Sequence, residues 1–416
     1  MKIKINKCTD LLCKYLLAII LILNCRSIWM NMVGIREWIA NVLLLLMVIC
    51  IITEIIIKKR VFRSMLYQTI QWIVMTDIYL LIFIILNPYN ISQFIKLLIA
   101  VSAIMLYFGV CENEGFPKIF LAYSDVMLIV TAFSLVMWLL GPILGIVSPS
   151  ETVYMNWSNM GEDVPVKSYY GIYFSTQGQL SVLNILTAIR NTAIFTEGPM
   201  CSFQISLAFL IELFCDKKRN NIRLFIFTVG IISTLSTTGY ILILAAYMGR
   251  YIIDKPKQKF LYYIKICILP FGGILALGLS YILIESKLGT GSGNIRIDDF
   301  VVGFRAWSLK PILGAGYGNQ EYIQSFMGSW RAFNNGFSNS VMTVLAQTGV
   351  YGGALYFIPI VLKVKDSLIK RRWNEFFLVC LMGYMIIFTV VTYNFITLFF
   401  VSWCFWSRNN TKSNHN

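Results

Sequence analysis

The sequence predicts an all-α integral membrane protein whose chain crosses the bilayer many times. Of its 416 residues, 57% are hydrophobic and only 13% are charged, and the mean hydropathy is +0.70. A soluble domain carries roughly a quarter of charged residues, so one water-soluble globule could not hide this much apolar surface. Apolar runs of bilayer-spanning length recur along the whole chain, which predicts a polytopic helical bundle of about 12 transmembrane helices.

The expected spans follow from these apolar runs. They are 11–31, 38–57, 69–87, 94–110, 119–147, 199–214, 222–236, 240–253, 260–283, 339–362, 374–391 and 393–406. Residues 222–253 form one apolar stretch that the sequence STTG interrupts, and basic clusters flank it on both sides. Because both clusters belong on the cytoplasmic side, we expect two short helices joined by a turn. The N-terminus resembles a signal peptide without a cleavage motif, so we expect an uncleaved first helix.

The distribution of charge sets the expected orientation. The net charge is +15, and Lys and Arg gather in short clusters between apolar runs. This pattern is typical of cytoplasmic loops and argues against a nucleic-acid partner. We expect both termini in the cytoplasm. The chain then divides into N-terminal transmembrane helices (1–147), a long external loop (148–198), further transmembrane helices (199–284), a second long external loop (285–338) and C-terminal helices with a cytoplasmic tail (339–416). Loops of this length are usually functional.

Several kinds of chemistry are excluded by the residues that the chain lacks. The ten cysteines fall in or beside apolar runs, and the one histidine, His415, lies in the polar tail. This pattern supports neither a disulfide framework nor a zinc site. No phosphate-binding GxxxxGK[ST] loop and no DxD motif occur, so we expect no metal and no cofactor. An external enzyme of this kind needs a donor carried on a lipid, because nucleotide-linked donors are cytoplasmic.

The second long loop contains a candidate helix. Asp298 or Asp299 suits a helix N-cap, and apolar residues follow with helical spacing before Pro311. We therefore expect a short amphipathic helix over 299–309 at the outer membrane surface, with Trp307 at the depth of the headgroups.

Two arginines flank or enter this expected helix. Arg296 and Arg305 are nine residues apart and so cannot share one helical face, which places Arg296 at or before the helix start. Either this stretch is only a surface helix with a tight turn, or the two arginines face an anionic lipid headgroup, since guanidinium groups bind phosphate oxygens well. The glycines that follow, including Gly316, predict a turn with exposed backbone N–H groups.

The first long loop ends in a second candidate cluster, Arg190 and Glu197, just before an expected helix that starts near Pro199. Either these charges form an interfacial ion pair or a helix cap, or Arg190 binds phosphate and Glu197 orients it or accepts a proton. The same loop is rich in aromatic residues, which either stack on sugar rings or anchor the chain in the membrane interface. These residues are Tyr154, Trp157, Tyr169, Tyr170 and Tyr173.

Four motifs occur in a characteristic order: RNTAIFTEGP, STTG, IRIDDFVVGFRAWSLKPILGAGYGN and SNSVMTVLAQTGVYGGALYFIPI. Over about residues 187–360 this order resembles the superfamily of O-antigen or capsular polysaccharide polymerases and O-antigen ligases. In that family the turn between the two short helices often carries an arginine. Here it reads Thr237-Thr238-Gly239, so one cation must come from elsewhere. Ligases usually carry a histidine where the tenth span begins. Here Asn339 stands in that region, which favours a polymerase.

The resemblance implies a Wzy-type polymerase with a GT-C-like fold, in the plasma (inner) membrane of a bacterium. It would transfer a glycan from undecaprenyl diphosphate to the hydroxyl of a second lipid-linked repeat unit, without metal or nucleotide. Arg190, Arg296 and Arg305 would neutralise the diphosphate leaving group, and Glu197 is the first candidate for the base, with Asp298 or Asp299 as alternates.

In the same reading, Trp307, Gly316 and Asn339 would contact the substrate. Partners would be the lipid-linked oligosaccharide and membrane lipids, with flippase and chain-length regulator proteins as further candidates. The alternatives are an O-antigen ligase, a lipid-linked oligosaccharide flippase or transporter, and a non-catalytic membrane scaffold.

Overall fold

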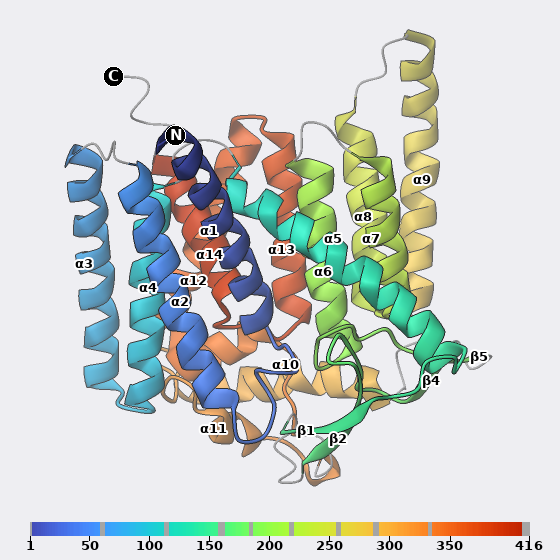
Figure 1. Cartoon of the computed structure of the whole chain (residues 1–416), viewed down its shortest axis with the longest axis horizontal. Coiled ribbons are helices and arrows are strands. Elements are labelled where there is room, and N and C mark those ends of the chain that lie inside the picture. The colour runs from blue at the N-terminus through green and yellow to red at the C-terminus, as the bar shows by residue number, and fades with distance from the viewer. Residues whose placement is uncertain are drawn as a thin grey trace.

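A computed structural model of the chain describes residues 2–58, 63–111, 116–156, 163–182, 186–215, 220–254, 259–285, 291–331 and 335–409. These residues form a predominantly α-helical bundle (Figure 1). Its apolar helices are α1 (Lys2–Asn24), α2 (Arg36–Lys58), α3 (Arg63–Leu86), α4 (Ile91–Val110), α5 (Lys118–Trp138), α6 (Gly198–Phe214), α7 (Asn221–Ser233), α8 (Thr237–Ile253), α9 (Lys259–Glu285), α12 (Ser340–Ile369), α13 (Trp373–Phe388) and α14 (Phe395–Asn409).

Five of these helices are long and apolar enough to cross a bilayer by themselves: α2, α3, α4, α12, and α5 with the π-helical turn Leu139–Ile143 that extends it. Shorter apolar helices occur in α6, α7, α8, α9, α13 and α14. Large apolar side chains face outward along the bundle, for example Ile85 at 74% exposure and Leu277 at 73%. Such surface is stable only in lipid, so the chain is a helical membrane protein. The count of about 12 spans remains a prediction.

The bundle is built around α6, which is buried on all sides and packs against α5, α7, α8 and α13. A helix that is apolar around its whole circumference belongs in the core of such an assembly. The expected break in the apolar stretch 222–253 is confirmed, because α7 ends at Ser233 and α8 begins at Thr237 after the N-cap residue Ser236. The helix α5 crosses the bundle obliquely in Figure 1.

The two long segments lie at the same end of the bundle (Figure 1). In that view α1 starts and α14 ends at the upper end, whereas the strands, α10 (Gly291–Leu309) and α11 (Gln320–Gln324) lie at the lower end. The sequence predicted that both long segments share one face, and the fold has this arrangement. We call this lower end the loop end of the bundle.

The first long segment forms two small antiparallel sheets, which the expectation of an all-α protein did not include. One sheet has the order β1 (Glu151–Met155), β2 (Val164–Tyr169), β3 (Tyr173–Ser175), and the other pairs β4 (Gln179–Val182) with β5 (Leu186–Ile189). Alternate residues of β2, including Val166 and Ser168, are buried, which is the period of a strand with one covered face. β-branched and aromatic residues favour this conformation.

In the second long segment, α10 lies across the loop end of the bundle and packs against α12 (Figure 1). The predicted helix was 299–309, but α10 already begins at Gly291. The prediction of its start was wrong because Asp298 and Asp299 do not cap the helix. They lie inside it and pair with Arg331 of the short 3₁₀ helix Ser329–Arg331.

Candidate functional site

A cavity of about 540 Å³ opens at the loop end, where α6, α8, α9, α10 and α13 converge. Three arginines line it, Arg26, Arg190 and Arg296, and Glu197 lines it with them. Arg190 and Arg296 come from the two different long segments, so the fold brings together the side chains that the sequence had placed in separate loops. We call this space the arginine cavity.

Arg190 follows directly after β5 and is held by neutral partners. Its Nη1 donates to Oε1 of Gln177 at 3.2 Å, and its Nη2 donates to the carbonyl of Leu235, in the α7–α8 turn, also at 3.2 Å. Gln177 also accepts from the backbone N–H of Gly198 at 3.1 Å. A Cβ on Gly198 would lie 2.8 Å from Cδ of Arg190, so a glycine is required for this approach.

Arg296 lies inside α10 and reaches the other wall of the cavity. Its Nη1 donates to Oγ1 of Thr238 at 3.2 Å and to the carbonyl of Phe388 at 3.3 Å. Thr238 lies in the first turn of α8 and Phe388 ends α13, so both bonds use groups at helix ends. The STTG turn therefore contributes the hydroxyl group of Thr238 to the site rather than a cation.

Arg26 is the cavity arginine that sequence reasoning missed. It lies in the connection after α1 with a positive φ of 52°, and its carbonyl accepts from the N–H of Thr196 at 3.2 Å. Its Nη1 lies 3.5 Å from Oε1 of Glu197. Because the STTG turn contains no arginine, we expected one cation of the site to come from elsewhere in the chain. Arg26 is a third guanidinium group in the cavity. An arginine at the end of an apolar run was the available signal.

The cavity has an excess of positive charge. Among the described residues that line it, three carry guanidinium groups and only Glu197 carries a carboxylate. Burial lowers the pKa of Arg190 from its ordinary value, Glu197 opposes this shift and the positive charge of Arg296 adds to it. The Nε of Arg190 is buried with no hydrogen-bond partner among the described residues. Clustered cations that share so little negative charge favour the binding of an anion.

Other buried cations of the bundle have carboxylate partners of their own. Arg223 lies 2.7 Å from Glu212 and 2.6 Å from Asp125, and Lys363 lies 2.5 Å from Glu375. These pairs neutralise charge inside the helices, as a low-dielectric surrounding requires. The arginine cavity differs from them because its counter-charge is incomplete.

Glu197 occupies the N-cap position of α6, with Pro199 in the first turn, as the sequence predicted. Its side chain makes no capping hydrogen bond and is 22% exposed. A carboxylate at this end of a helix is favoured by the helix dipole. Glu197 is thus a partly accessible carboxylate at the edge of the arginine cavity.

The alternate carboxylates are engaged elsewhere. Oδ1 of the fully buried Asp299 lies 2.6 Å from Nη1 of Arg331, and its Oδ2 accepts from the N–H of Ser338 at 2.8 Å. Asp298 lies 3.0 Å from the same Nη1. Burial raises the pKa of Asp299, whereas Ser338 and Arg331 act to lower it. These contacts tie the end of the second segment to α10, and neither aspartate lines the cavity.

Arg305 and Trp307 lie on the half of α10 that is outside the cavity. The side chain of Arg305 is exposed, and neither residue is among those that line the arginine cavity. The indole Nε1 of Trp307 donates to the carbonyl of Pro311 at 3.1 Å, and its ring packs edge-on against Phe304. The structure therefore brings Arg190 and Arg296 together and leaves Arg305 and Trp307 apart from them.

The glycine-rich turn is packed against α12, so the prediction of exposed N–H groups was wrong. The N–H of Gly316 donates to the carbonyl of Gln347 at 2.9 Å, and the N–H of Gly314 donates to Lys310. Both glycines have positive φ. A Cβ on Gly314 would lie 2.4 Å from the carbonyl carbon of Gln347. This turn fits beside the kink of α12 at Gly349, whose φ is 61°.

Asn339 is the N-cap of α12 rather than a cavity residue. Its side chain accepts from the N–H of Met342 at 3.0 Å, and the residue is 2% exposed. Its neighbour Ser338 lines the cavity instead. The side chain that lines the cavity therefore belongs to the residue before the predicted one.

The aromatic residues of the first segment divide into two groups. Tyr169 and Tyr173 are buried and pack edge-on against each other with ring centroids 5.6 Å apart, so they cannot stack on a sugar. Tyr154 and Tyr170 are 55% and 67% exposed, but they do not line the arginine cavity. Trp157 lies outside the described residues.

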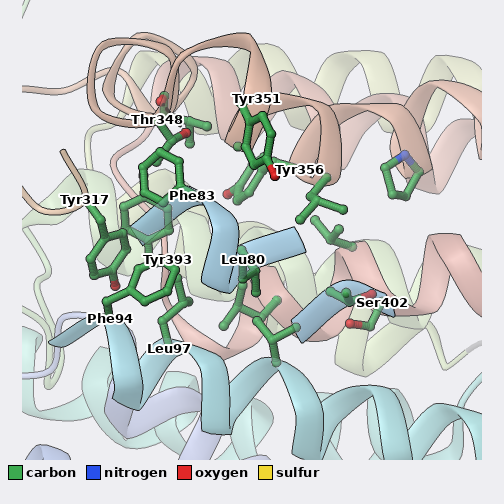
Figure 2. A pocket seen from close by; sticks show the side chains of 18 of the residues that line it. Leu80, Phe83, Phe94, Leu97, Tyr317, Thr348, Tyr351, Tyr356, Tyr393 and Ser402 are labelled. Atoms are coloured by element: carbon green, nitrogen blue, oxygen red, sulfur yellow. Dashed lines mark hydrogen bonds between the residues drawn. The ribbon is translucent and has the colours of Figure 1, made fainter. Parts of the chain in front are cut away.

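A second, smaller cavity of about 140 Å³ lies between α3, α4, α12 and α14 (Figure 2). Its described lining carries no charged side chain and includes Tyr317, which follows the glycine turn. The ring of Tyr317 packs against Phe94 at 5.5 Å and Tyr393 at 4.7 Å between centroids. The glycine turn thus places an aromatic anchor between helices, and of these two cavities the arginine cavity is the one with charged side chains in its described lining.

No protein-family model matches the chain, and no curated protein matches it significantly.

Proposed function

We propose that the protein is a polysaccharide polymerase that joins oligosaccharide repeat units carried on undecaprenyl diphosphate, at the external face of a bacterial plasma membrane. The observation that carries the proposal is the arginine cavity. Arg190 and Arg296, from two long segments, line one space with Arg26 and share the single carboxylate of Glu197 among its described lining. A diphosphate supplies the missing negative charge, and guanidinium groups match its oxygens in geometry.

In the proposed reaction, a hydroxyl oxygen of the acceptor sugar attacks the anomeric carbon of the donor glycan. The bond between that carbon and the diphosphate oxygen breaks, and undecaprenyl diphosphate leaves with the bonding electron pair. Negative charge develops on the leaving oxygen, where the arginines stabilise it. The hydroxyl proton passes to the carboxylate of Glu197 or to the departing diphosphate.

The position of Glu197 supports this role. It is partly exposed, it lies 3.5 Å from Arg26, and it is the described carboxylate that shares the cavity with the arginines. Asp298 and Asp299 are both paired with Arg331, so Glu197 is the better candidate for the base. The neutral partners of Arg190 and Arg296 leave the positive charge of both guanidinium groups available to a ligand.

The test is reconstitution of the purified full chain in proteoliposomes with lipid-linked repeat units, without nucleotide or added metal. A ladder of lengthened glycans with release of undecaprenyl diphosphate is the expected result. Glycan transferred to a different acceptor would instead identify a ligase. Movement of intact lipid-linked units across the bilayer, with no lengthening, would identify a flippase.

A further inference from the structure

The lining of the arginine cavity combines charged and apolar side chains. Its charged residues are Arg26, Arg190, Arg296 and Glu197. Its apolar residues include Ile241 of α8, Ile284 of α9, Ile297 and Phe300 of α10, and Phe388 of α13. A cavity with both kinds of lining fits a ligand that has an anionic head and a hydrocarbon body.

The apolar lining comes from helices that do not all pack against one another. α8 packs against both α9 and α13 and forms the back wall. Over the described residues, α9 makes no comparable packing with α13 or α10, although both also line the cavity. Figure 1 shows α9 at the edge of the bundle, beside α8. The two side walls therefore stand apart on the side that faces away from α8.

The rim of this gap is apolar and exposed. Ile284 and Ile297 both line the cavity, yet they are 48% and 51% exposed. Leu277 on α9 and Val301 on α10 continue these exposed apolar faces at helical spacing, with 73% and 42% exposure. Apolar surface of this kind is stable beside acyl chains and costly in water, so the gap faces the hydrocarbon of the bilayer.

The size of the cavity decides what must pass through the gap. A pocket of about 300–1,000 Å³ accommodates a ligand of drug size. The arginine cavity, at about 540 Å³, can hold a diphosphate with the first sugar and the first carbons of its lipid. A long hydrocarbon chain cannot fit within it and has to leave sideways.

We propose that the gap that separates α9 from α10 and α13 is the passage through which the polyprenyl chain of a lipid diphosphate extends from the arginine cavity into the bilayer. This inference rests on the proposed function, because it takes the lipid-linked substrate from it. The chain would pass Ser280 and Ile284 on α9 and Phe300 and Phe388 across the gap. The ring centroids of Phe300 and Phe388 lie 6.2 Å apart, so these two residues form one wall of the passage.

The test is to narrow the passage without touching the arginines. Ser280→Trp places a bulky ring on the cavity side of α9. Leu275→Trp is the matched control, since Leu275 is 64% exposed, does not line the cavity and lies on the opposite side of α9 from Ile284. The probes are a C55 polyprenyl diphosphate and inorganic pyrophosphate, and binding to the purified full chain is measured.

We expect Ser280→Trp to weaken binding of the C55 diphosphate by about tenfold or more and to leave pyrophosphate binding within about twofold of the wild type. Leu275→Trp should change neither. Unchanged binding of the C55 compound to Ser280→Trp, or an equal loss for both probes, would overturn the passage. As a second measurement, a photo-cross-linking amino acid in place of Ile284 should label the polyprenyl chain, whereas one in place of Leu275 should not. Labelling at both sites or at neither would contradict the proposal.

The binding test is independent of catalysis. If the C55 diphosphate binds through this gap but no glycan is lengthened, the proposed function fails and the passage stands. If glycans are lengthened, but Ser280→Trp does not weaken binding of the C55 diphosphate and the cross-linker in place of Ile284 does not label the polyprenyl chain, the passage fails and the proposed function stands.

Discussion

The two halves of α10 carry similar residues in different surroundings. In the first half, Arg296 enters the arginine cavity and bonds to Thr238 and to the carbonyl of Phe388. In the second half, Arg305 is exposed and outside the cavity. Nine residues make two and a half helical turns, so the two side chains point in opposite directions. An arginine beside aromatic residues is therefore not enough to define the site. The helical face on which the arginine lies decides whether its side chain reaches the arginine cavity.

The comparison extends to the rest of the second segment. Residues near Arg296 and Ser338 face the cavity, whereas Arg331, the glycine turn and Asn339 hold the segment in place through buried contacts. Changes in the first group should impair activity, and changes in the second should mainly reduce stability. Five predictions test this division.

The largest effect is expected from the cavity arginines. Arg296→Ala or Arg190→Ala should lower the rate of glycan lengthening by at least about 100-fold, because each removes a charge that stabilises the leaving group. Arg305→Ala is the matched control on the same helix and should keep nearly full activity. The measurement is the initial rate in proteoliposomes with equal amounts of membrane-inserted protein. Equal losses for Arg296→Ala and Arg305→Ala would break the distinction between the two halves of α10.

The next effect is on stability. Arg331→Met should lower the free energy of unfolding by about 3–5 kcal/mol, because it leaves Asp299 buried without its partner. Thermal unfolding in detergent measures this loss. Adding Asp299→Asn should restore part of it, since the uncompensated charge is then removed. If Arg331→Met alone is as stable as the wild type, the ion pair between Arg331 and Asp299 does not hold the segment in place.

The same variant predicts a dependence on pH. Burial raises the pKa of Asp299 and Arg331 counteracts it, so removing Arg331 should raise this pKa further. A raised pKa in the folded state means that the folded protein binds the proton more tightly than the unfolded chain. The loss of unfolding free energy caused by Arg331→Met should therefore be largest above the pKa of Asp299 in the folded variant. It should shrink as the pH falls through that pKa. If the loss of unfolding free energy in Arg331→Met does not change with pH, this account of Asp299 is wrong.

A smaller loss is expected in the glycine turn. Gly314→Ala combines a left-handed backbone, φ 65°, with a Cβ 2.4 Å from the carbonyl carbon of Gln347. Gly145→Ala is the control, because Gly145 has φ 66° and nothing within 4 Å of its Cβ. The strain of the conformation alone costs about 1 kcal/mol or somewhat more, so Gly314→Ala should lose clearly more stability than Gly145→Ala. Equal losses would mean that the turn is not tightly seated on α12.

The smallest effect is expected at Asn339. Asn339→Ala removes the N-cap of α12 and should cost about 1 kcal/mol of stability. Asn339→Ser retains a capping group and should recover most of it. Because Asn339 does not line the cavity, both variants should lengthen glycans at close to the wild-type rate under stabilising conditions. A large loss of activity in Asn339→Ser would show that Asn339 takes part in the reaction and does not only cap α12.

The amino-acid sequence by itself determined the class of fold and much of the division of the chain into helices and long segments. Apolar runs, basic clusters and the STTG break predicted a helical membrane protein, the separate helices α7 and α8, and two long segments on one face. These features depend on composition and local order, which are visible in one dimension. The same reasoning selected Arg190, Glu197 and Arg296, because charges beside apolar spans are costly unless they have a partner or a role.

Only the tertiary structure decided which of the candidates meet. It brought Arg26 from the end of α1 to Glu197, and it excluded Arg305 through the direction of a helical face. It also paired Asp299 with Arg331 and closed the glycine turn on α12, although both had looked available in the sequence. The physical reason is that long-range packing sets the surroundings of a side chain, and the surroundings decide whether a charge is neutralised, buried or left to bind a ligand.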